Sequence, residues 1–148
     1  MSNPNPLQIV SVIAVIRNSE NKYLLVQRSA NDDILPLKWQ NLGGKVELGE
    51  RIEFALLREI EEEVGIKLPE TIKPIFLQSY SWKKDEKSPY RLGLIFLLEV
   101  DEVDKVNLSD ELDDFGWFTM NEIETLNTIG KDSPTGTIAQ IKQVEVYK

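Results

Sequence analysis

The alternation of apolar and polar runs along the chain predicts several strands and only a few helices. Residues 10–17 (VSVIAVIR) and 23–29 (YLLVQRS) are rich in β-branched and apolar residues and are separated by the polar NSENK, so we expect two strands joined by a hairpin turn. A second pair of strands is expected at 72–82 and 91–100, on either side of the polar loop KKDEKSPY. Residues 113–119 (DDFGWFT) predict one further strand.

The longest helix is predicted at residues 51–64 (RIEFALLREIEEEV), because the apolar positions recur there with the period of an α-helix. Gly65 follows directly and suits the left-handed conformation that often ends a helix. Before this helix, residues 29–50 predict a loop and then a short extended segment punctuated by glycines. Residues 121–126 predict a short helix, and the second half of 131–148 predicts a closing helix without recognisable chemistry.

These elements predict one mixed α+β domain that covers residues 1–148, with residues 1–8 as a loose polar tail. A chain of 148 residues, 41% of them hydrophobic, can form one compact core. No run approaches 18 apolar residues, which argues against a membrane span. The N-terminus lacks the basic start and apolar run of a signal peptide, so the cytoplasm is the expected location.

The composition excludes several kinds of chemistry. The chain has no cysteine and no histidine, which rules out thiolate nucleophiles, histidine-based triads and the usual zinc sites. The formal charge of −8, from 17 basic and 25 acidic residues, argues against a nucleic acid polymer as partner. A small anionic ligand is still compatible with this charge if metal ions supply positive charge at the site.

Four glutamates gather in the second half of the predicted helix, and their angular positions divide them into two groups. With about 100° between residues, Glu62 and Glu63 lie on either side of Glu59, whereas Glu61 points in the opposite direction. The three carboxylates continue the face on which the first half of the helix is apolar, at Ile52, Ala55 and Leu56. This face predicts a position towards the interior or a cleft. The alternative is an exposed glutamate-rich helix with partners four residues away.

Three carboxylates near a core raise one another's pKa or require a counter-charge. Arg58 flanks them, but a single guanidinium cannot balance three negative charges. Mg²⁺ or Mn²⁺ can, because hard cations prefer oxygen ligands. The preceding Gly43 and Gly44 allow the backbone to approach a ligand closely, and Glu50 lies near the helix start, where the dipole favours an acid. Taken separately, these residues also fit a simple turn that leads into a helix.

Residues 44–66 match the pattern G-x5-E-x7-R-E-U-x-E-E-x-G-U, where U is aliphatic, and resemble the signature box of the Nudix hydrolases with every fixed position filled. The resemblance implies an α/β/α sandwich around a mixed sheet, in which the box forms a loop–helix–loop motif. It also implies hydrolysis of a nucleoside diphosphate linked to another moiety, by attack of water on phosphorus with Mg²⁺ or Mn²⁺. The expected partner is a small nucleotide, and the expected assembly is a monomer or a homodimer. The matching residues are Gly44, Glu50, Arg58, Glu59, Ile60, Glu62, Glu63, Gly65 and Ile66.

The resemblance also implies roles for residues within the box. Glu59, Glu62 and Glu63 correspond to the family's metal ligands, often joined by a backbone carbonyl that maps onto Gly43. Arg58 corresponds to the arginine that orients a box carboxylate. The expected general base is Glu59 or Glu63, and the remaining fixed residues, Glu50 and Gly65, are structural.

The resemblance implies further site residues, of which Glu111 and Arg28 lie outside the box. Glu111, six residues before Trp117, matches a position from which the family recruits another acidic ligand or base, and it ranks behind the box glutamates as a base. Its neighbours Asp110, Asp113 and Asp114 compete for this role, and a solvated acidic loop is the alternative. Arg28 resembles the arginine that meets substrate phosphates, with Gly44 and Lys45 as further contacts. Ordinary surface charge is an equal alternative for Arg28 and Lys45.

The substrate is less clearly indicated. The lead-in KWQNLGGKV is similar to the WNGFGGKV type of the branch that hydrolyses oxidised purine nucleoside triphosphates, but Asn41 is displaced by one position. Ser81 occupies the place where a proline favours ADP-ribose, and Tyr80 lies near the tyrosine of dinucleoside polyphosphate hydrolases. We therefore expect a nucleoside triphosphate, with an oxidised purine nucleotide as the narrower candidate. The alternatives are a dinucleoside polyphosphate or nucleotide-sugar/ADP-ribose hydrolase, or a non-catalytic regulatory module that binds a nucleotide.

Five aromatic residues can stack on a base or, more commonly, pack in the core: Trp39, Tyr80, Trp82, Trp117 and Phe118.

Overall fold

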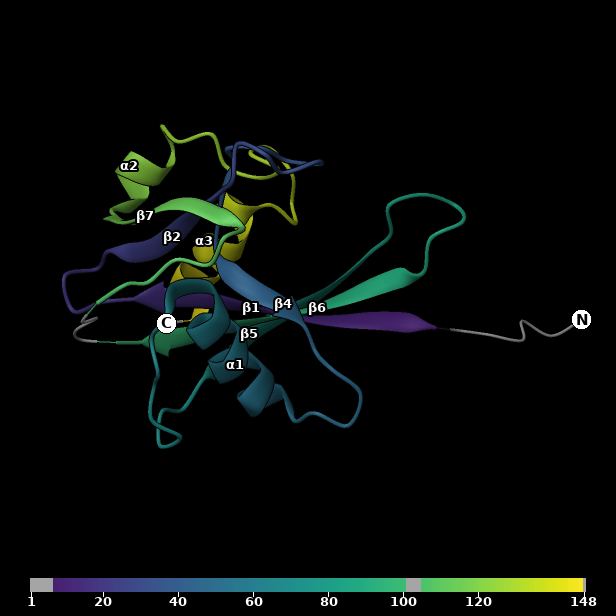
Figure 1. Ribbon diagram of the computed structural model, residues 1–148, viewed down its shortest axis with the longest axis horizontal. Helices are drawn as coiled ribbons and strands as arrows, with labels where there is room; N and C mark the ends of the chain where they lie inside the picture. The colour runs from purple at the N-terminus through teal and green to yellow at the C-terminus, as the bar shows by residue number, and fades with distance from the viewer. Residues whose placement is uncertain (1–6, 101–104, 148) are drawn as a thin grey trace, which may run out of the picture.

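A computed structural model of the chain describes residues 7–100 and 105–147 (Figure 1). The loose tail predicted for residues 1–8 therefore lies mostly outside the described residues. Within the described residues, three helices and seven strands follow one another as β1 (Gln8–Arg17), β2 (Tyr23–Arg28), β3 (Trp39–Gln40), β4 (Leu42–Lys45), α1 (Ile52–Val64), β5 (Ile75–Trp82), β6 (Tyr90–Glu99), β7 (Leu112–Phe118), α2 (Met120–Ile123) and α3 (Thr137–Tyr147).

The strands form one mixed sheet with β1 near its centre. The main order is β3-β2-β1-β6-β5, and β1 and β6 run parallel over their full length while β2 and β5 pair antiparallel with their neighbours. In addition, β7 pairs with β2, and β4 pairs antiparallel with the middle of β1, from Ser11 opposite Lys45 to Ala14 opposite Leu42. This pairing fixes the glycine-containing strand β4 next to the centre of the sheet.

The two faces of the sheet carry separate apolar clusters, as the twofold alternation of strand residues requires. On β2, Leu24 and Val26 belong to the cluster that packs against α1, whereas Tyr23 and Leu25 belong to the cluster formed with α2 and α3. Figure 1 shows α1 on one side of the strands and α3 on the other. The predicted α/β/α sandwich around a mixed sheet is confirmed. No helix of the described segments is long and apolar enough to cross a membrane.

Helix α1 buries one stripe of side chains and ends as predicted. Gly65 adopts a positive φ of 72°, and its amide donates to the carbonyl of Glu61. Beyond the helix, the amide of Asn107 donates to the Val64 carbonyl at 2.8 Å, and the amide of Ser109 donates to the Glu63 carbonyl at 3.0 Å. These bonds satisfy carbonyls that a helix end leaves unpaired, and they attach the segment before β7 to the end of α1. The buried stripe consists of Ala55, Leu56, Ile60 and Val64.

The predicted elements are present, with shifts at their ends. The two-residue strand β3 lies in the segment expected to be a loop, because Trp39 and Gln40 pair with β2 although they are too short for a strand pattern. Strand β5 begins three residues later than predicted, after Pro74, which has no amide hydrogen to donate. The short helix predicted at residues 121–126 is observed as α2, which ends at Ile123. The predicted closing helix is confirmed as α3.

Candidate active site

Three glutamates and the first glycine of the box line a cavity of about 740 Å³ between β4, α1 and the segment before β7. We call it the carboxylate cavity. Gly43 and Gly44 come from β4, three glutamates come from α1, and Ser109, Asp110 and Glu111 come from the segment that is bonded to the end of α1. Its acidic wall consists of Glu59, Glu62, Glu63, Asp110 and Glu111.

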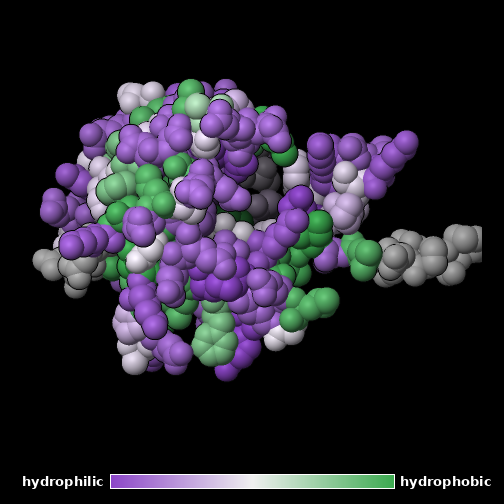
Figure 2. Space-filling model, viewed as in Figure 1, coloured by the Kyte–Doolittle hydropathy of each residue, from purple (hydrophilic) through white to green (hydrophobic). Residues whose placement is uncertain are grey.

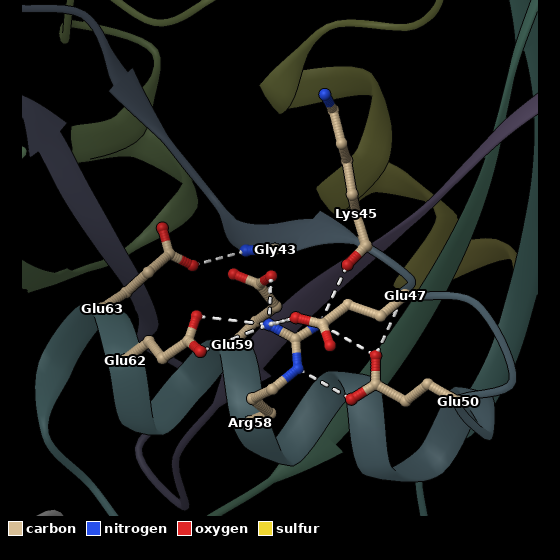
Figure 3. Close-up of polar contacts among 8 residues, drawn as sticks. All are labelled: Gly43, Lys45, Glu47, Glu50, Arg58, Glu59, Glu62 and Glu63. Carbon is tan, nitrogen blue, oxygen red and sulfur yellow. Dashed lines mark hydrogen bonds and ion pairs between the residues drawn. The ribbon is translucent and has the colours of Figure 1, made fainter.

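Arg58 lies beside the three glutamates and is held from outside the cavity. Its Nε and Nη2 donate to the two carboxylate oxygens of Glu50 at 2.7 and 2.9 Å, and Nη2 also donates to the carbonyl of Lys45 at 2.9 Å (Figure 3). This two-pronged bond holds the pKa of Glu50 down at about 2, together with the Glu47 amide that donates to Glu50. The same bond raises the pKa of Arg58. The guanidinium is therefore charged and fixed in direction.

The remaining nitrogen of Arg58 points towards the box carboxylates. Nη1 donates to Glu59 at 2.9 Å and to Glu62 at 3.2 Å. Burial nevertheless raises the pKa of Glu59, whose side chain is only 14% exposed. A Cβ atom at Gly44 would collide with the Glu59 carboxylate, so glycine at this position lets Glu59 keep its place beside β4.

Glu63 is the most strongly perturbed acid of the cavity. One of its oxygens accepts a hydrogen bond from the Gly43 amide at 2.8 Å. Burial raises its pKa to about 8, and the charges of Glu59, Glu111 and Glu62 add to the effect, although the Gly43 amide opposes it. The single charge of Arg58 therefore leaves uncompensated negative charge at this end of the cavity.

The predicted division of the four glutamates is confirmed. Glu59, Glu62 and Glu63 line one cavity, with the Glu62 side chain 57% exposed at its rim, and Glu61 is exposed and lines none of it. In the part of the chain that the structure describes, no three acids are placed to hold one ion as they stand. The reason is visible in Figure 3, where Glu59 and Glu62 face Arg58 and Glu63 faces the Gly43 amide.

The donor set nevertheless fits a divalent hard cation. The acidic groups offer oxygens, burial together with the charges of neighbouring carboxylates raises the pKa of Glu63, and Gly43 lines the same wall. Glu59 and Glu63 each keep one carboxylate oxygen outside these bonds, whereas both oxygens of Glu62 accept from Arg58, so an ion would compete with Arg58 mainly for Glu62. Arg58 would keep its position meanwhile, because Glu50 and the Lys45 carbonyl hold it independently.

The acids around Glu111 separate into two pairs. Glu111 and Asp110 line the carboxylate cavity, and the charge of Glu111 contributes to the raised pKa of Glu63. By contrast, Asp113 accepts a hydrogen bond from the Ala30 amide at 3.0 Å, and Asp114 accepts one from the Phe115 amide at 2.8 Å. Glu111 thus lies where the resemblance implied, with Asp110 as its remaining competitor.

Basic residues stand at the other side of the cavity. Arg28 donates to Asp32 at 2.6 Å and to Gln40 at 3.1 Å, and its Nε is buried without an acceptor among residues 7–100 and 105–147. Lys45 lines the cavity, but its side chain points away from the glutamates (Figure 3). Arg91, at the start of β6, lines the cavity too and was missed by the sequence prediction. A charged residue at a strand end is ordinary, so no sequence signal distinguished it.

A second cavity, of about 680 Å³, opens next to the first, and we call it the adjoining cavity. Its own residues come from the loop after β2, from strands β1, β4, β5 and β6, and from α3 with the segment before it, and they are largely apolar or amide-bearing. Figure 2 shows a hollow on this side of the molecule with mainly hydrophilic residues at its rim. The two cavities share one wall, made of Ser11, Arg28, Gln40, Gly43, Gly44 and Arg91.

Comparison with known proteins gives one consistent result. A family model described as the NUDIX domain matches residues 7–136. The chain is 31% identical over 124 residues to the nucleoside triphosphatase NudI of Klebsiella pneumoniae (strain 342). This alignment covers 77% of this chain and 84% of the relative. It superposes on the crystal structure of the MutT protein from Methanosarcina mazei Go1 with a TM-score of 0.74, 26% identity and 99% coverage of both chains. A NUDIX hydrolase from Nitrosomonas europaea gives a TM-score of 0.75 with 25% identity, covering 96% of this chain and 91% of that one.

Proposed function

The chain belongs to the Nudix family of hydrolases that act on pyrophosphate bonds, and from this premise we propose that it hydrolyses nucleoside triphosphates to a nucleoside monophosphate and pyrophosphate. The observation that supports this most is the wall shared by the two cavities. It lets one ligand place its phosphates beside the glutamates while its nucleoside extends into the adjoining cavity. The name of the relative from K. pneumoniae, a nucleoside triphosphatase, supports the same substrate class.

Phosphate binding is assigned to the basic residues of the shared wall. Arg28 and Arg91 face both cavities, and the buried Nε of Arg28 offers a donor to a phosphate oxygen. The contribution expected from Lys45 is reduced, because its side chain points away from the glutamates (Figure 3). Gly44 allows the triphosphate to approach the backbone closely.

Glu59, Glu62 and Glu63 are the proposed ligands of a divalent ion, with the Gly43 carbonyl and Glu111 as additional ones. Nudix hydrolases generally need such an ion, and we propose Mg²⁺ or Mn²⁺. When bound, it supplies positive charge at the phosphates and makes a water molecule more acidic. Arg58, which Glu50 holds in place, is proposed to orient Glu59 through its Nη1.

In the proposed reaction, a water oxygen attacks phosphorus and the bond to the bridging oxygen breaks, so that pyrophosphate leaves with the electron pair of that bond. The water proton passes to a carboxylate of the cavity. Glu59 and Glu63 are the first candidates for this role, because both line the cavity and burial raises the pKa of each. Glu111 is the third candidate.

The test is a panel of nucleoside triphosphates, dinucleoside polyphosphates, nucleotide sugars and ADP-ribose, each with Mg²⁺, with Mn²⁺ or with EDTA. We expect the triphosphates to give monophosphate and pyrophosphate, measured by ion-exchange chromatography, only when metal is present. Glu62→Gln prepared in parallel controls for contaminating hydrolases. Preferential cleavage of another class of substrate, or release of single phosphates from the triphosphate, would contradict the proposal. Cytoplasmic location and the oligomeric state stay predictions.

A further inference from the structure

Asn41, between β3 and β4, is a buried polar residue that the proposed chemistry does not use. It is 5% exposed and lines the adjoining cavity, not the carboxylate cavity. Its Oδ1 is buried and has no hydrogen-bond partner in the described parts of the chain. Buried polar atoms are almost always paired, so an unpaired acceptor in a cavity wall indicates a group that a ligand can satisfy.

The direction of the Asn41 amide is fixed by a chain of hydrogen bonds that begins at a backbone carbonyl. The carbonyl of Thr135 can only accept, so Gln140 must turn its Nε2 towards it, at 3.1 Å. The oxygen of Gln140 then faces Asn41 and accepts from its Nδ2 at 2.9 Å. If the Asn41 side-chain amide were flipped, its oxygen would face the oxygen of Gln140. If the Gln140 amide were flipped, its oxygen would face the Thr135 carbonyl, and neither pair contains a donor. The atom of Asn41 that stays without a partner is therefore an acceptor, Oδ1, and not a donor.

The rest of the adjoining cavity suits a flat, partly apolar ring. Leu35, Ile129 and Tyr80 supply apolar surface. Trp82 lies in the same wall with 45% of its surface exposed. Unlike the other four aromatic residues considered in the sequence, Trp82 belongs to neither core cluster, so packing does not account for its position. A planar heterocycle can stack on such a surface and meet a polar group at its edge.

We propose that Asn41 is a specificity-determining residue whose Oδ1 accepts a hydrogen bond from an N–H or amino group of the substrate's nucleobase. The inference rests on the proposed function, because it places the base of a nucleoside triphosphate in the adjoining cavity. Asn41 Oδ1 is covered in the ligand-free arrangement, so the base reaches it only when neighbouring side chains shift. Ile34 and Leu35 belong to the loop at this cavity, and Ile34 is 71% exposed, which leaves it free to move.

A second unpaired atom shows that burial alone is insufficient for this assignment. Thr128 Oγ1 is also buried without a partner among the residues described, but Thr128 lines neither of the two cavities. Among the buried atoms of residues 7–100 and 105–147, only Asn41 Oδ1 combines an unpaired acceptor, an amide of fixed direction and a residue in a cavity wall that is continuous with the phosphate-binding side. The proposed role of Asn41 is to recognise the nucleobase, and it takes no part in the reaction at phosphorus.

The experiment compares nucleobases that differ only in the proposed donor. Non-hydrolysable imidotriphosphates are prepared in four matched pairs: guanosine with N1-methylguanosine, uridine with N3-methyluridine, adenosine with N6,N6-dimethyladenosine, and cytidine with N4,N4-dimethylcytidine. Their dissociation constants are measured by calorimetry with Mg²⁺ for the wild type and for three variants. Asn41→Leu removes the acceptor, Gln140→Met releases the amide so that it can rotate, and Gln143→Met is the matched control on the same helix. Thermal unfolding verifies that each variant folds.

For at least one pair, we expect methylation to weaken binding about tenfold in the wild type and in Gln143→Met, because one buried hydrogen bond is lost. The penalty should fall to about twofold in Asn41→Leu and to an intermediate value in Gln140→Met. If Asn41→Leu does not fold, the change in Gln140→Met decides. The inference is overturned if methylation has no effect on any pair, if the wild type binds none of the analogues, or if the penalty is undiminished in the variants.

Hydrolysis of the parent triphosphates by the wild type is recorded separately. Its absence would contradict the proposed function, whereas hydrolysis without a role of Asn41 would contradict this inference alone.

Discussion

The carboxylate cavity and the adjoining cavity share a wall but are built in different ways. In the first, the three glutamates and the glycines that face them lie within one short stretch, from Gly43 to Glu63, and they are held by Arg58 and by the Gly43 amide. In the second, Asn41 is oriented by Gln140, which lies 99 residues further along the chain. The reaction chemistry is thus encoded locally, whereas recognition of the substrate depends on contacts between distant segments.

The difference has an energetic counterpart. Negative charges gather in the carboxylate cavity, where burial raises the pKa of Glu63 to about 8, so a cation gains more there than at an exposed acidic surface. The adjoining cavity has a neutral amide as its distinctive polar group, and neutral hydrogen bonds contribute modest free energies. We therefore expect changes in the first cavity to abolish turnover of every substrate, and changes in the second to alter which substrate is preferred.

The largest effect is expected for Glu62→Gln, which removes one proposed ligand charge without changing the shape of the side chain. Turnover should fall by about a thousandfold for every nucleoside triphosphate, because stabilisation of charge at the phosphates is lost. Thermal unfolding should change little, since the side chain is 57% exposed. Steady-state release of pyrophosphate with several bases measures the effect.

Glu61→Gln is the matched control, since it removes the same charge one residue earlier on the solvent side of α1. Its turnover should equal that of the wild type. A comparable loss in both variants would mean that the overall charge of the helix matters, and not its inner face. A loss for one base only would contradict the division of labour between the two cavities.

Arg58→Lys should have the next largest effect, reducing turnover by about ten- to a hundredfold, as is typical for a residue that orients metal ligands. Lysine keeps the charge but cannot donate two parallel bonds to Glu50 while also meeting Glu59. The distinguishing measurement is the Mg²⁺ concentration for half-maximal activity, which should rise. A lower unfolding temperature with an unchanged metal requirement would instead assign Arg58 a purely structural role.

The sequence predicted the carboxylate cavity better than its surroundings for physical reasons. Glu59, Glu62 and Glu63 could be placed because helical spacing alone determines which face they share. Arg91 could not, since its approach to the cavity depends on the register of β6 against β1. The direction of the Lys45 side chain was equally hidden, because it is set by the pairing of β4.

Asn41 shows the same limit most clearly. Its displacement by one position from the lead-in of a known branch removed it from consideration as a base-reading residue. In the structure, Asn41 lies in the wall of the adjoining cavity and donates a hydrogen bond to Gln140 of α3. The predicted sheet, the predicted α1 and the closing helix were correct, but a helix without recognisable chemistry turned out to orient a residue of the proposed substrate cavity.

Gly44→Ala and Gly65→Ala separate activity from stability within the box. A methyl group at Gly44 would meet the flexible end of Glu59, so the side chain can move aside, and turnover should fall about tenfold with little change in stability. At Gly65 the φ of 72° disfavours any side chain, and alanine should cost about 1–2 kcal/mol of unfolding free energy. Turnover of the folded Gly65→Ala protein should be nearly normal. Chemical denaturation and kinetics on both variants provide the comparison, and identical behaviour would show that the box acts as one structural unit.

The smallest effect is expected at the boundary between the cavities, for Asp32→Asn. Asp32 accepts from Arg28 at 2.6 Å and from the amides of Ile34 and Leu35. Its loss should raise KM by roughly threefold for every base, without changing kcat, because Arg28 is then held less firmly in the shared wall. An effect on one base alone would place Arg28 with the adjoining cavity and weaken its assignment to phosphate.

We also expect Asp32→Asn to change how the stability of the protein depends on pH. The backbone amides of Leu35 and Ile34, with Arg28, lower the pKa of Asp32 from 3.8 to about 2 in the folded protein. The carboxylate is therefore charged more readily when folded, and the stability that it contributes is complete above about pH 4 and is lost as the pH falls towards 2. Denaturation midpoints of the wild type and Asp32→Asn should differ most at neutral pH and converge below pH 3. Parallel curves over this range would show that the Arg28–Asp32 pair orients a side chain for phosphate without stabilising the loop, which would confine its role to the cleft itself.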